Sequence, residues 1–93
     1  MQFETFEDLA QLVASEFKAV INEEGFDDFN DMADCYQWTA EDIKSEVDYY
    51  LQNATDGDAC LSDDGLDVYF HGTNMMISYR TFSRMWRRRL VTA

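Results

Sequence analysis

Residues 66–80 read LDVYFHGTNMMISYR, and this stretch decides the fold. Apolar and polar side chains alternate across residues 66–71 and again across residues 75–80, and the segment between them is Gly72-Thr73-Asn74. A period of two residues is typical of a half-buried strand, and a short turn-forming segment between two such runs is typical of a hairpin. The stretch therefore predicts two antiparallel strands.

The elements on either side of this hairpin follow from their own patterns. Asp63-Asp64-Gly65 has the composition of a turn, so a short strand over residues 59–62 would complete a three-stranded antiparallel meander. After the hairpin, Thr81 is placed to cap a closing helix. The apolar positions of that helix are Phe82, Met85, Trp86 and Leu90, and its outer positions are Arg84, Arg87 and Arg88.

The N-terminal half has helical periodicity instead. Thr5 and Asp8 form a capping pair at the start of a long first helix, and Gly25 stands where that helix would end. The apolar positions that recur at helical spacing are Phe6, Leu9, Ala10, Val13, Phe17, Val20 and Ile21.

Two more helices are expected before the meander. Residues 27–36 carry an apolar stripe that ends at Tyr36, with acidic residues at the favourable N-terminal end. A second capping pair, Thr39 with Asp42, starts a third helix that reaches about Asn53. The expected inward positions of the third helix are Ile43, Val47, Tyr50 and Leu51.

Together these elements predict an α+β protein with a single domain over residues 1–93. Residues 1–54 form an acidic helical part, residues 59–93 form the meander and the Arg-rich C-terminal helix, and the polar stretch 53–58 joins them. All four helices and the sheet can share one core if the helices lie on one face of the sheet.

The charges are divided along the chain. All 19 acidic side chains lie between Glu4 and Asp67, so the net charge is −17 over residues 1–67 and +5 over residues 68–93. Such a field repels nucleic acid and anionic lipid and attracts proteins with a basic working surface. With 46% hydrophobic and 15% aromatic residues, the chain is nevertheless too apolar to be an acidic disordered tail.

Features of secretion and membrane insertion are not found in this sequence. The N-terminal residues lack a basic segment, and no apolar run approaches the ~18 residues that span a bilayer. We therefore expect a cytoplasmic protein, in the host cytoplasm if a phage encodes it. Cys35 and Cys60 are too few and too isolated for a disulfide framework and would remain thiols there.

An acidic ridge is expected on the second helix. At about 100° per residue, Asp27, Asp31 and Asp34 fall on nearly one line, opposite the apolar stripe. A rise of ~1.5 Å per residue separates Asp27 from Asp31 by about 6 Å, close to two axial phosphate steps of ~3.4 Å along a DNA strand. This spacing motivates the hypothesis of nucleic-acid mimicry.

A second acidic surface is expected on the third helix. Asp42, Glu46 and Asn53 share a face with Tyr49, an aromatic residue outside the apolar stripe. An aromatic ring beside carboxylates can anchor an interface while the charges steer the approach of a partner. The alternative is that these acids form a solvated helix face that maintains solubility, or that they reflect adaptation to high salt.

The Arg-rich end has two interpretations. Cations in the last turn complement the negative end of the helix dipole and can pair with the protein's own carboxylates, which favours a structural role. Arg84, Arg87 and Arg88 share a face and could instead contact nucleic acid, although the charge of the remaining chain opposes the approach of a polyanion.

No residue pattern indicates an enzyme, a cofactor or a metal site. His71, the single histidine, is expected on the surface beside a turn, and its distance from Cys35 or Cys60 does not follow from the sequence. The loop around Asp56 and Asp58 is acidic but departs from the calcium-binding loop pattern, which needs a third oxygen ligand and a glycine at its sixth place. We expect no catalytic residues.

In size, acidity, aromatic content and lack of catalytic motifs, the chain resembles the small inhibitors that phages and plasmids use against nucleases, of the anti-CRISPR and anti-restriction type. Bacterial nuclease-immunity proteins are similar in the same way. Both classes imply that carboxylates occupy a cationic nucleic-acid site on the target while aromatic contacts form the desolvated centre. The residues that carry this resemblance are Asp27, Asp31, Asp34, Asp42, Glu46, Asp48 and Tyr49.

The sequence therefore supports one leading hypothesis of function and two alternatives. The first is a non-enzymatic inhibitor or adaptor that binds a basic protein such as a nuclease. The second is an assembly module in which the acidic helices of one copy meet the Arg-rich helix of the next. The third is direct nucleic-acid binding by the last helix.

Overall fold

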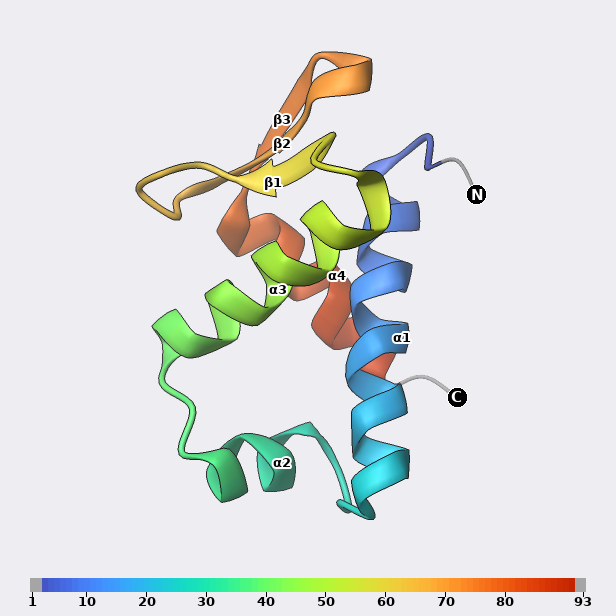
Figure 1. Cartoon of the computed structure of the whole chain (residues 1–93), viewed down its shortest axis with the longest axis vertical. Helices are drawn as coiled ribbons and strands as arrows, with labels where there is room; N and C mark the ends of the chain where they lie inside the picture. The colour runs from blue at the N-terminus through green and yellow to red at the C-terminus, as the bar shows by residue number, and fades with distance from the viewer. Residues whose placement is uncertain (1–2, 92–93) are drawn as a thin grey trace.

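The computed structural model describes residues 3–91 and begins with helix α1, Phe6–Glu24 (Figure 1). Its start is the predicted capping box: the amide of Asp8 donates to Thr5 Oγ1, and the amide of Thr5 donates to Asp8 Oδ2, each at 3.1 Å. Its end is Gly25, whose φ of 78° lies in the left-handed region that glycine adopts without strain. Both ends of α1 confirm the sequence prediction.

Helices α2, Phe29–Tyr36, and α3, Ala40–Thr55, follow with shifted ends. Helix α2 begins two residues later than predicted because Asp28 is its N-cap, accepting from the amide of Asp31 at 2.8 Å. Asp27 therefore lies outside the helix. The predicted capping box starts α3, which continues two residues past Asn53 and so includes part of the expected joint.

The predicted meander is confirmed as an antiparallel sheet in the order β1-β2-β3. Its strands are β1, Ala59–Leu61, β2, Asp67–Phe70, and β3, Met75–Ser78. Val68 and Phe70 are buried on the inner face, whereas Leu66 precedes β2 and is 61% exposed. The strand predicted over residues 66–71 was therefore too long.

Helix α4, Tyr79–Val91, follows β3 directly. The second predicted strand was therefore too long at its end, because Tyr79 already begins the helix. Ser78, and not Thr81, occupies the capping position: its Oγ accepts from the amide of Thr81 at 3.2 Å. The predicted inward residues of α4 are confirmed, with Phe82 and Trp86 fully buried.

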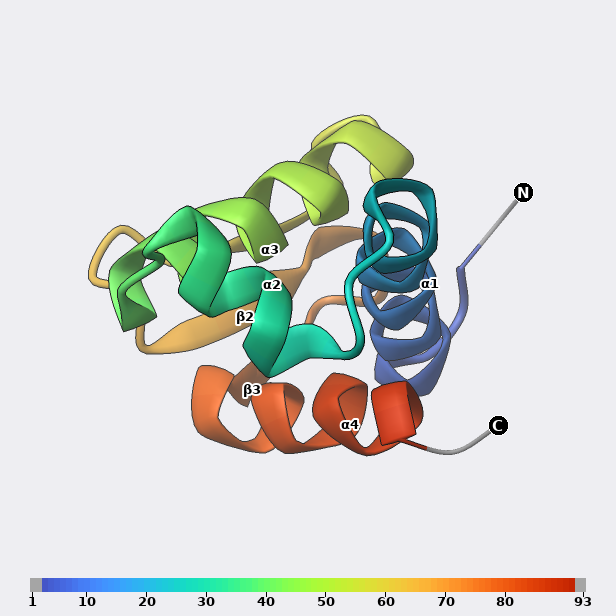
Figure 2. The ribbon, with the colours of Figure 1, turned by 90° about the horizontal axis from the view of Figure 1, so that it is seen from below.

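The core joins both halves of the chain. Helix α1 packs against α4, and Phe17 of α1 lies 5.0 Å from Trp86 of α4 between ring centroids. Figure 1 shows the sheet at one end of the molecule and α2 at the opposite end, and Figure 2 views it from the α2 end, with α3 and α4 on either side of α2. Helix α2 is thus remote from the sheet, unlike the arrangement expected from the sequence. Helix α2 contributes Phe29 and Met32 to the core, and the ring centroids of Phe29 and Trp86 are 5.4 Å apart.

None of the helices within residues 3–91 combines the length and the apolarity that crossing a bilayer requires.

Candidate functional site

The outward side of α3 presents an aromatic residue among acids. Tyr49 is 62% exposed, and its ring lies 6.0 Å from that of Tyr50. At about 100° per residue, Asp42, Glu46 and Asn53 lie within about 60° of Tyr49 around the axis of α3, so the four residues share one face. Next to this ring is a shallow depression of about 380 Å³ that Asn53 helps to line. The structure therefore keeps these predicted residues together on one surface.

Two further tyrosines extend this surface across the helices. Tyr50 is half-buried, and burial, followed by the charges of Glu46 and Glu16, raises the pKa of its phenol to about 12. Tyr36 is 43% exposed, and desolvation followed by the charge of Glu24 raises the pKa of its phenol. We call this surface the acidic aromatic face; it consists of Glu16, Glu24, Tyr36, Asp42, Glu46, Tyr49 and Tyr50.

The sequence prediction assigned Tyr49 to this face but missed Tyr36 and Tyr50. Tyr36 was expected in the core, but it lies at the end of α2, where it packs against Trp38 and Phe26 at centroid distances of 5.2 and 5.5 Å. Tyr50 is inward on one side only, in edge contact with Phe17 at 5.2 Å. A tyrosine on an apolar stripe can present its polar end to water, and this property of the residue type is the one sequence signal that points to both residues.

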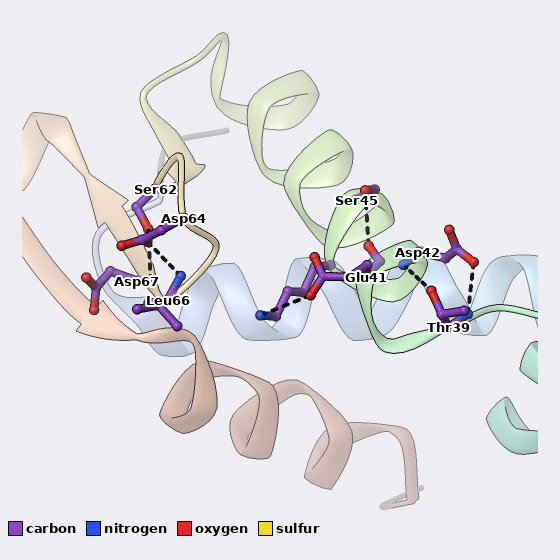
Figure 3. Close-up of polar contacts among 9 residues, drawn as sticks. Thr39, Glu41, Asp42, Ser45, Ser62, Asp64, Leu66 and Asp67 are labelled. Carbon is purple, nitrogen blue, oxygen red and sulfur yellow. Dashed lines mark hydrogen bonds and ion pairs between the residues drawn. The ribbon is translucent and has the colours of Figure 1, made fainter.

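Two predicted interface acids are engaged in capping. Asp42 Oδ2 accepts from the amide of Thr39 at 2.9 Å, and Thr39 Oγ1 accepts from the amide of Asp42 at 3.2 Å (Figure 3). Asp31 Oδ2 accepts from the amide of Asp27 at 3.0 Å. These carboxylates have a structural role in fixing the starts of α3 and α2.

Asp48 joins α3 to the sheet. Its Oδ1 accepts from the amide of Leu61 in β1 at 2.8 Å, and its Oδ2 accepts from Gln52 Nε2 at 2.8 Å. The residue is half-buried and lies on the flank of α3 that faces β1. Asp48 is therefore primarily a structural residue, and nothing in its sequence context indicated this contact.

The expected ridge on α2 is not formed by all three of its residues. Asp31 and Asp34 are exposed on α2. Asp27 lies before the helix and lines a hollow of about 410 Å³ together with Lys18 and Arg87. The regular spacing that motivated phosphate mimicry by Asp27, Asp31 and Asp34 therefore fails at Asp27.

The three arginines predicted as a possible contact with nucleic acid, Arg84, Arg87 and Arg88, have different surroundings in the structure. The guanidinium of Arg87 stacks over Trp86 at 4.6 Å and over Phe29 at 5.2 Å, and its Nε donates to Ser83 Oγ at 3.0 Å. Arg84 and Arg88 are exposed. Arg84 forms no ion pair with a carboxylate within residues 3–91, so intramolecular pairing does not explain its presence.

Cys60 and His71 meet on the outer side of the sheet. The Cys60 sulfur lies 3.7 Å from His71 Nε2, a proximity that the sequence did not show. Burial, followed by the charges of Asp48 and Asp63, raises the pKa of the Cys60 thiol. A nucleophilic cysteine needs the opposite shift, so this environment favours the unreactive thiol.

The acid-rich turn before β2 binds its own backbone. Asp64 Oδ1 accepts from Ser62 Oγ at 2.6 Å and from the amide of Leu66 at 3.0 Å, as drawn in Figure 3. These hydrogen bonds lower the pKa of Asp64, the bond from Ser62 most. In the part of the chain that the structure describes, no group of three or more His, Cys, Asp or Glu side chains could hold a metal ion.

No protein-family model, no curated protein and no solved structure matches this chain.

Proposed function

We propose that this protein is a non-enzymatic inhibitor or adaptor that binds a basic, nucleic-acid-binding surface of a partner protein, such as a nuclease. The contact surface is the acidic aromatic face. The observation that carries the proposal is the 62% exposure of Tyr49 on the face of α3 that also carries Asp42 and Glu46.

An exposed tyrosine among acids suits a protein interface. Tyrosine buries a large area at low entropic cost and is enriched among the residues that dominate binding energy. Tyr36 and Tyr50 belong to the same face, and their phenols are protonated at neutral pH, since an ordinary phenol has a pKa of 10.0 and burial raises both values further. Their hydroxyl groups can therefore donate hydrogen bonds to a partner.

The charges of this face are available to a cationic partner. The carboxylate of Glu46 makes no hydrogen bond or ion pair with the rest of residues 3–91. A net charge of −12 on 93 residues costs stability through self-repulsion, and a basic partner relieves that repulsion while its approach is accelerated. Asp31 and Asp48 contribute to this field although their oxygens accept bonds within the protein.

The proposed target class follows from this chemistry. A surface that attracts acidic groups on this scale is typical of proteins that bind nucleic acid. We therefore place the protein with anti-CRISPR, anti-restriction or nuclease-immunity inhibitors, acting in the cytoplasm, or in the host cytoplasm if a phage encodes it. Occupation of a nucleic-acid site predicts competition between this protein and DNA or RNA for the partner.

The test is binding to a panel of purified cationic nucleases by biolayer interferometry, at low and at moderate salt, with and without competing DNA. We expect association to slow as salt rises and DNA to compete. Tyr49→Ala should weaken binding by about 2 kcal/mol, mainly through faster dissociation. The pair Glu16→Gln/Glu46→Gln should slow association.

A matched control removes the same charge elsewhere. Glu7→Gln/Asp63→Asn changes two exposed carboxylates outside the acidic aromatic face. If this control slows association as much as Glu16→Gln/Glu46→Gln, and Tyr49→Ala has no effect, the acidic aromatic face is not the interface. Partner binding that is indifferent to competing DNA would refute the nucleic-acid-site assignment.

Self-assembly through acidic and Arg-rich faces makes a different prediction. It requires oligomers that grow with protein concentration and disappear when Arg84, Arg87 and Arg88 are replaced. Light scattering of the purified protein separates this alternative from the proposal, which needs no second copy.

A further inference from the structure

A cationic groove lies between α3, the β1–β2 turn and the start of α4. It has a volume of about 470 Å³, within the size range of small-molecule sites. Four of the seven basic side chains of this acidic protein line it. The residues that matter for its chemistry are Lys44, Leu66, Tyr79, Arg80, Arg84 and Arg87.

Two of these cations are fixed in the groove wall. Lys44 Nζ lies 3.8 Å from Glu41 and 5.2 Å from the centre of the Tyr79 ring, and its side chain is 22% exposed. The guanidinium of Arg87 is held by Ser83 and by the ring of Trp86. Their positions are set by the fold before any ligand arrives, which lowers the entropic cost of binding.

The other two cations have no such engagement. Arg80 and Arg84 are exposed and one helical turn apart on α4. Neither guanidinium group makes a hydrogen bond or an ion pair within residues 3–91. Because the chain has an excess of carboxylates, the lack of a paired carboxylate at Arg80 and Arg84 leaves positive charge exposed at the groove rim.

Tyr79 supplies a neutral donor between these charges. Burial raises the pKa of its phenol, although the charge of Arg87 and the side chains of Ser83 and Trp86 oppose the shift. Like an ordinary phenol, it is protonated at neutral pH, and its ring, with Leu66, gives the groove an apolar part.

The net charge of the protein selects the size of the ligand. Solvent-exposed charges act over a Debye length of about 8–10 Å at physiological salt. A polyanion or a second acidic protein would lie against much of the −12 surface, whereas a small anion in the groove meets Arg80, Arg84 and Arg87, with Lys44 partly neutralised by Glu41. Charge complementarity therefore favours a compact anion.

We propose that this groove binds a small organic phosphate of about mononucleotide size. Arginine guanidinium groups match phosphate oxygens with paired, charge-assisted hydrogen bonds, which Arg80 and Arg84 are free to form. Lys44 provides a fixed charge on the opposite side, and Tyr79 and Leu66 receive the organic part. This site is separate from the acidic aromatic face and does not depend on the function proposed for that face.

The experiment is an NMR titration of the ¹⁵N-labelled protein with ADP and with pyrophosphate in magnesium-free buffer, with calorimetry for affinity. We expect saturable 1:1 binding with shifts confined to Lys44, Leu66, Tyr79 and the first two turns of α4. Arg84→Gln should weaken ADP binding roughly tenfold, and Arg80→Gln/Arg84→Gln should weaken it further.

Arg89→Gln is the matched control, because Arg89 Nη1 donates to the carbonyl of Met85 and does not line the groove. This variant should bind ADP as the unmodified protein does. Three outcomes would overturn the proposal: no saturable shift with millimolar ADP or pyrophosphate, equal loss in Arg84→Gln and Arg89→Gln, or citrate binding as tightly as pyrophosphate. Affinity for oligonucleotides that rises steadily with their length would also overturn it in favour of a nucleic-acid surface.

Discussion

The Asp48 carboxylate accepts a hydrogen bond from the backbone amide of Leu61 at 2.8 Å, so an acid on α3 also holds the first strand of the sheet. Asp48→Ala should lower the free energy of unfolding by about 1–3 kcal/mol, because the half-buried amide loses its charged acceptor. Asp48→Asn, which keeps a carbonyl oxygen, should cost less. Urea unfolding followed by circular dichroism measures both, and Asp34→Ala, at an exposed site on α2, should change stability by less than ~0.5 kcal/mol.

The capping box of α1 should make stability depend on acid pH. Hydrogen bonds from the amides of Glu4 and Thr5 lower the pKa of Asp8 from 3.8. A lowered folded pKa contributes stability above the unfolded value, and that contribution is lost as the pH falls through the folded value. The difference in Tm between the unmodified protein and Asp8→Ala should be largest above pH 3.8 and should narrow below it. A constant difference across this range would contradict the shift.

Tyr50 should govern stability at alkaline pH. Its pKa is raised from 10.0 to about 12, chiefly by burial, so its neutral form stabilises the fold below pH 10.0 and this contribution is lost as the pH rises towards 12. Tyr50→Phe, which cannot ionise, should therefore lose less stability than the unmodified protein between these values. Ultraviolet titration of the phenol should show a lower pKa in Glu46→Gln, since a neighbouring negative charge is removed.

The start of α4 provides a test of the observed cap. Ser78→Ala should reduce stability by about 1 kcal/mol, because Ser78 Oγ accepts from the amide of Thr81. Thr81→Ala should cost less than ~0.5 kcal/mol, since the hydroxyl of Thr81 bonds only to the Ser78 side chain among residues 3–91. Thermal unfolding of both variants separates the two positions. A larger loss at Thr81 would restore the start predicted from the sequence.

Much of the fold could be predicted because its signals are local. The capping boxes at Thr5 and Thr39, the left-handed Gly25 and the change of period after residue 58 each involve residues a few positions apart. The boundary between β3 and α4 was wrong because alternation alone cannot distinguish the end of a strand from a helix that begins at Tyr79. Ser78 carried the decisive signal, a hydroxyl three residues before a helical amide.

The candidate site was less predictable because it depends on contacts between elements. Periodicity placed Tyr49 and Glu46 on one face of α3 correctly. It treated Tyr36 as a core residue, because an apolar stripe does not show where the helix packed beside it ends and leaves a side chain exposed. The role of Asp48 depends on β1, and the groove brings Lys44 to arginines of the opposite half of the chain. Such pairings arise only from packing.

Trp86 lies between the groove and helices α1 and α2. Its ring contacts Phe17 of α1 and Phe29 of α2, and it lies beneath the guanidinium of Arg87 at the groove. Its Nε1 is fully buried, so a polar group that moves close to the ring should change its emission. In a Trp38→Phe background, Trp86 is the single tryptophan, and its fluorescence emission should therefore report changes both at the groove and in the packing of α2 against the core.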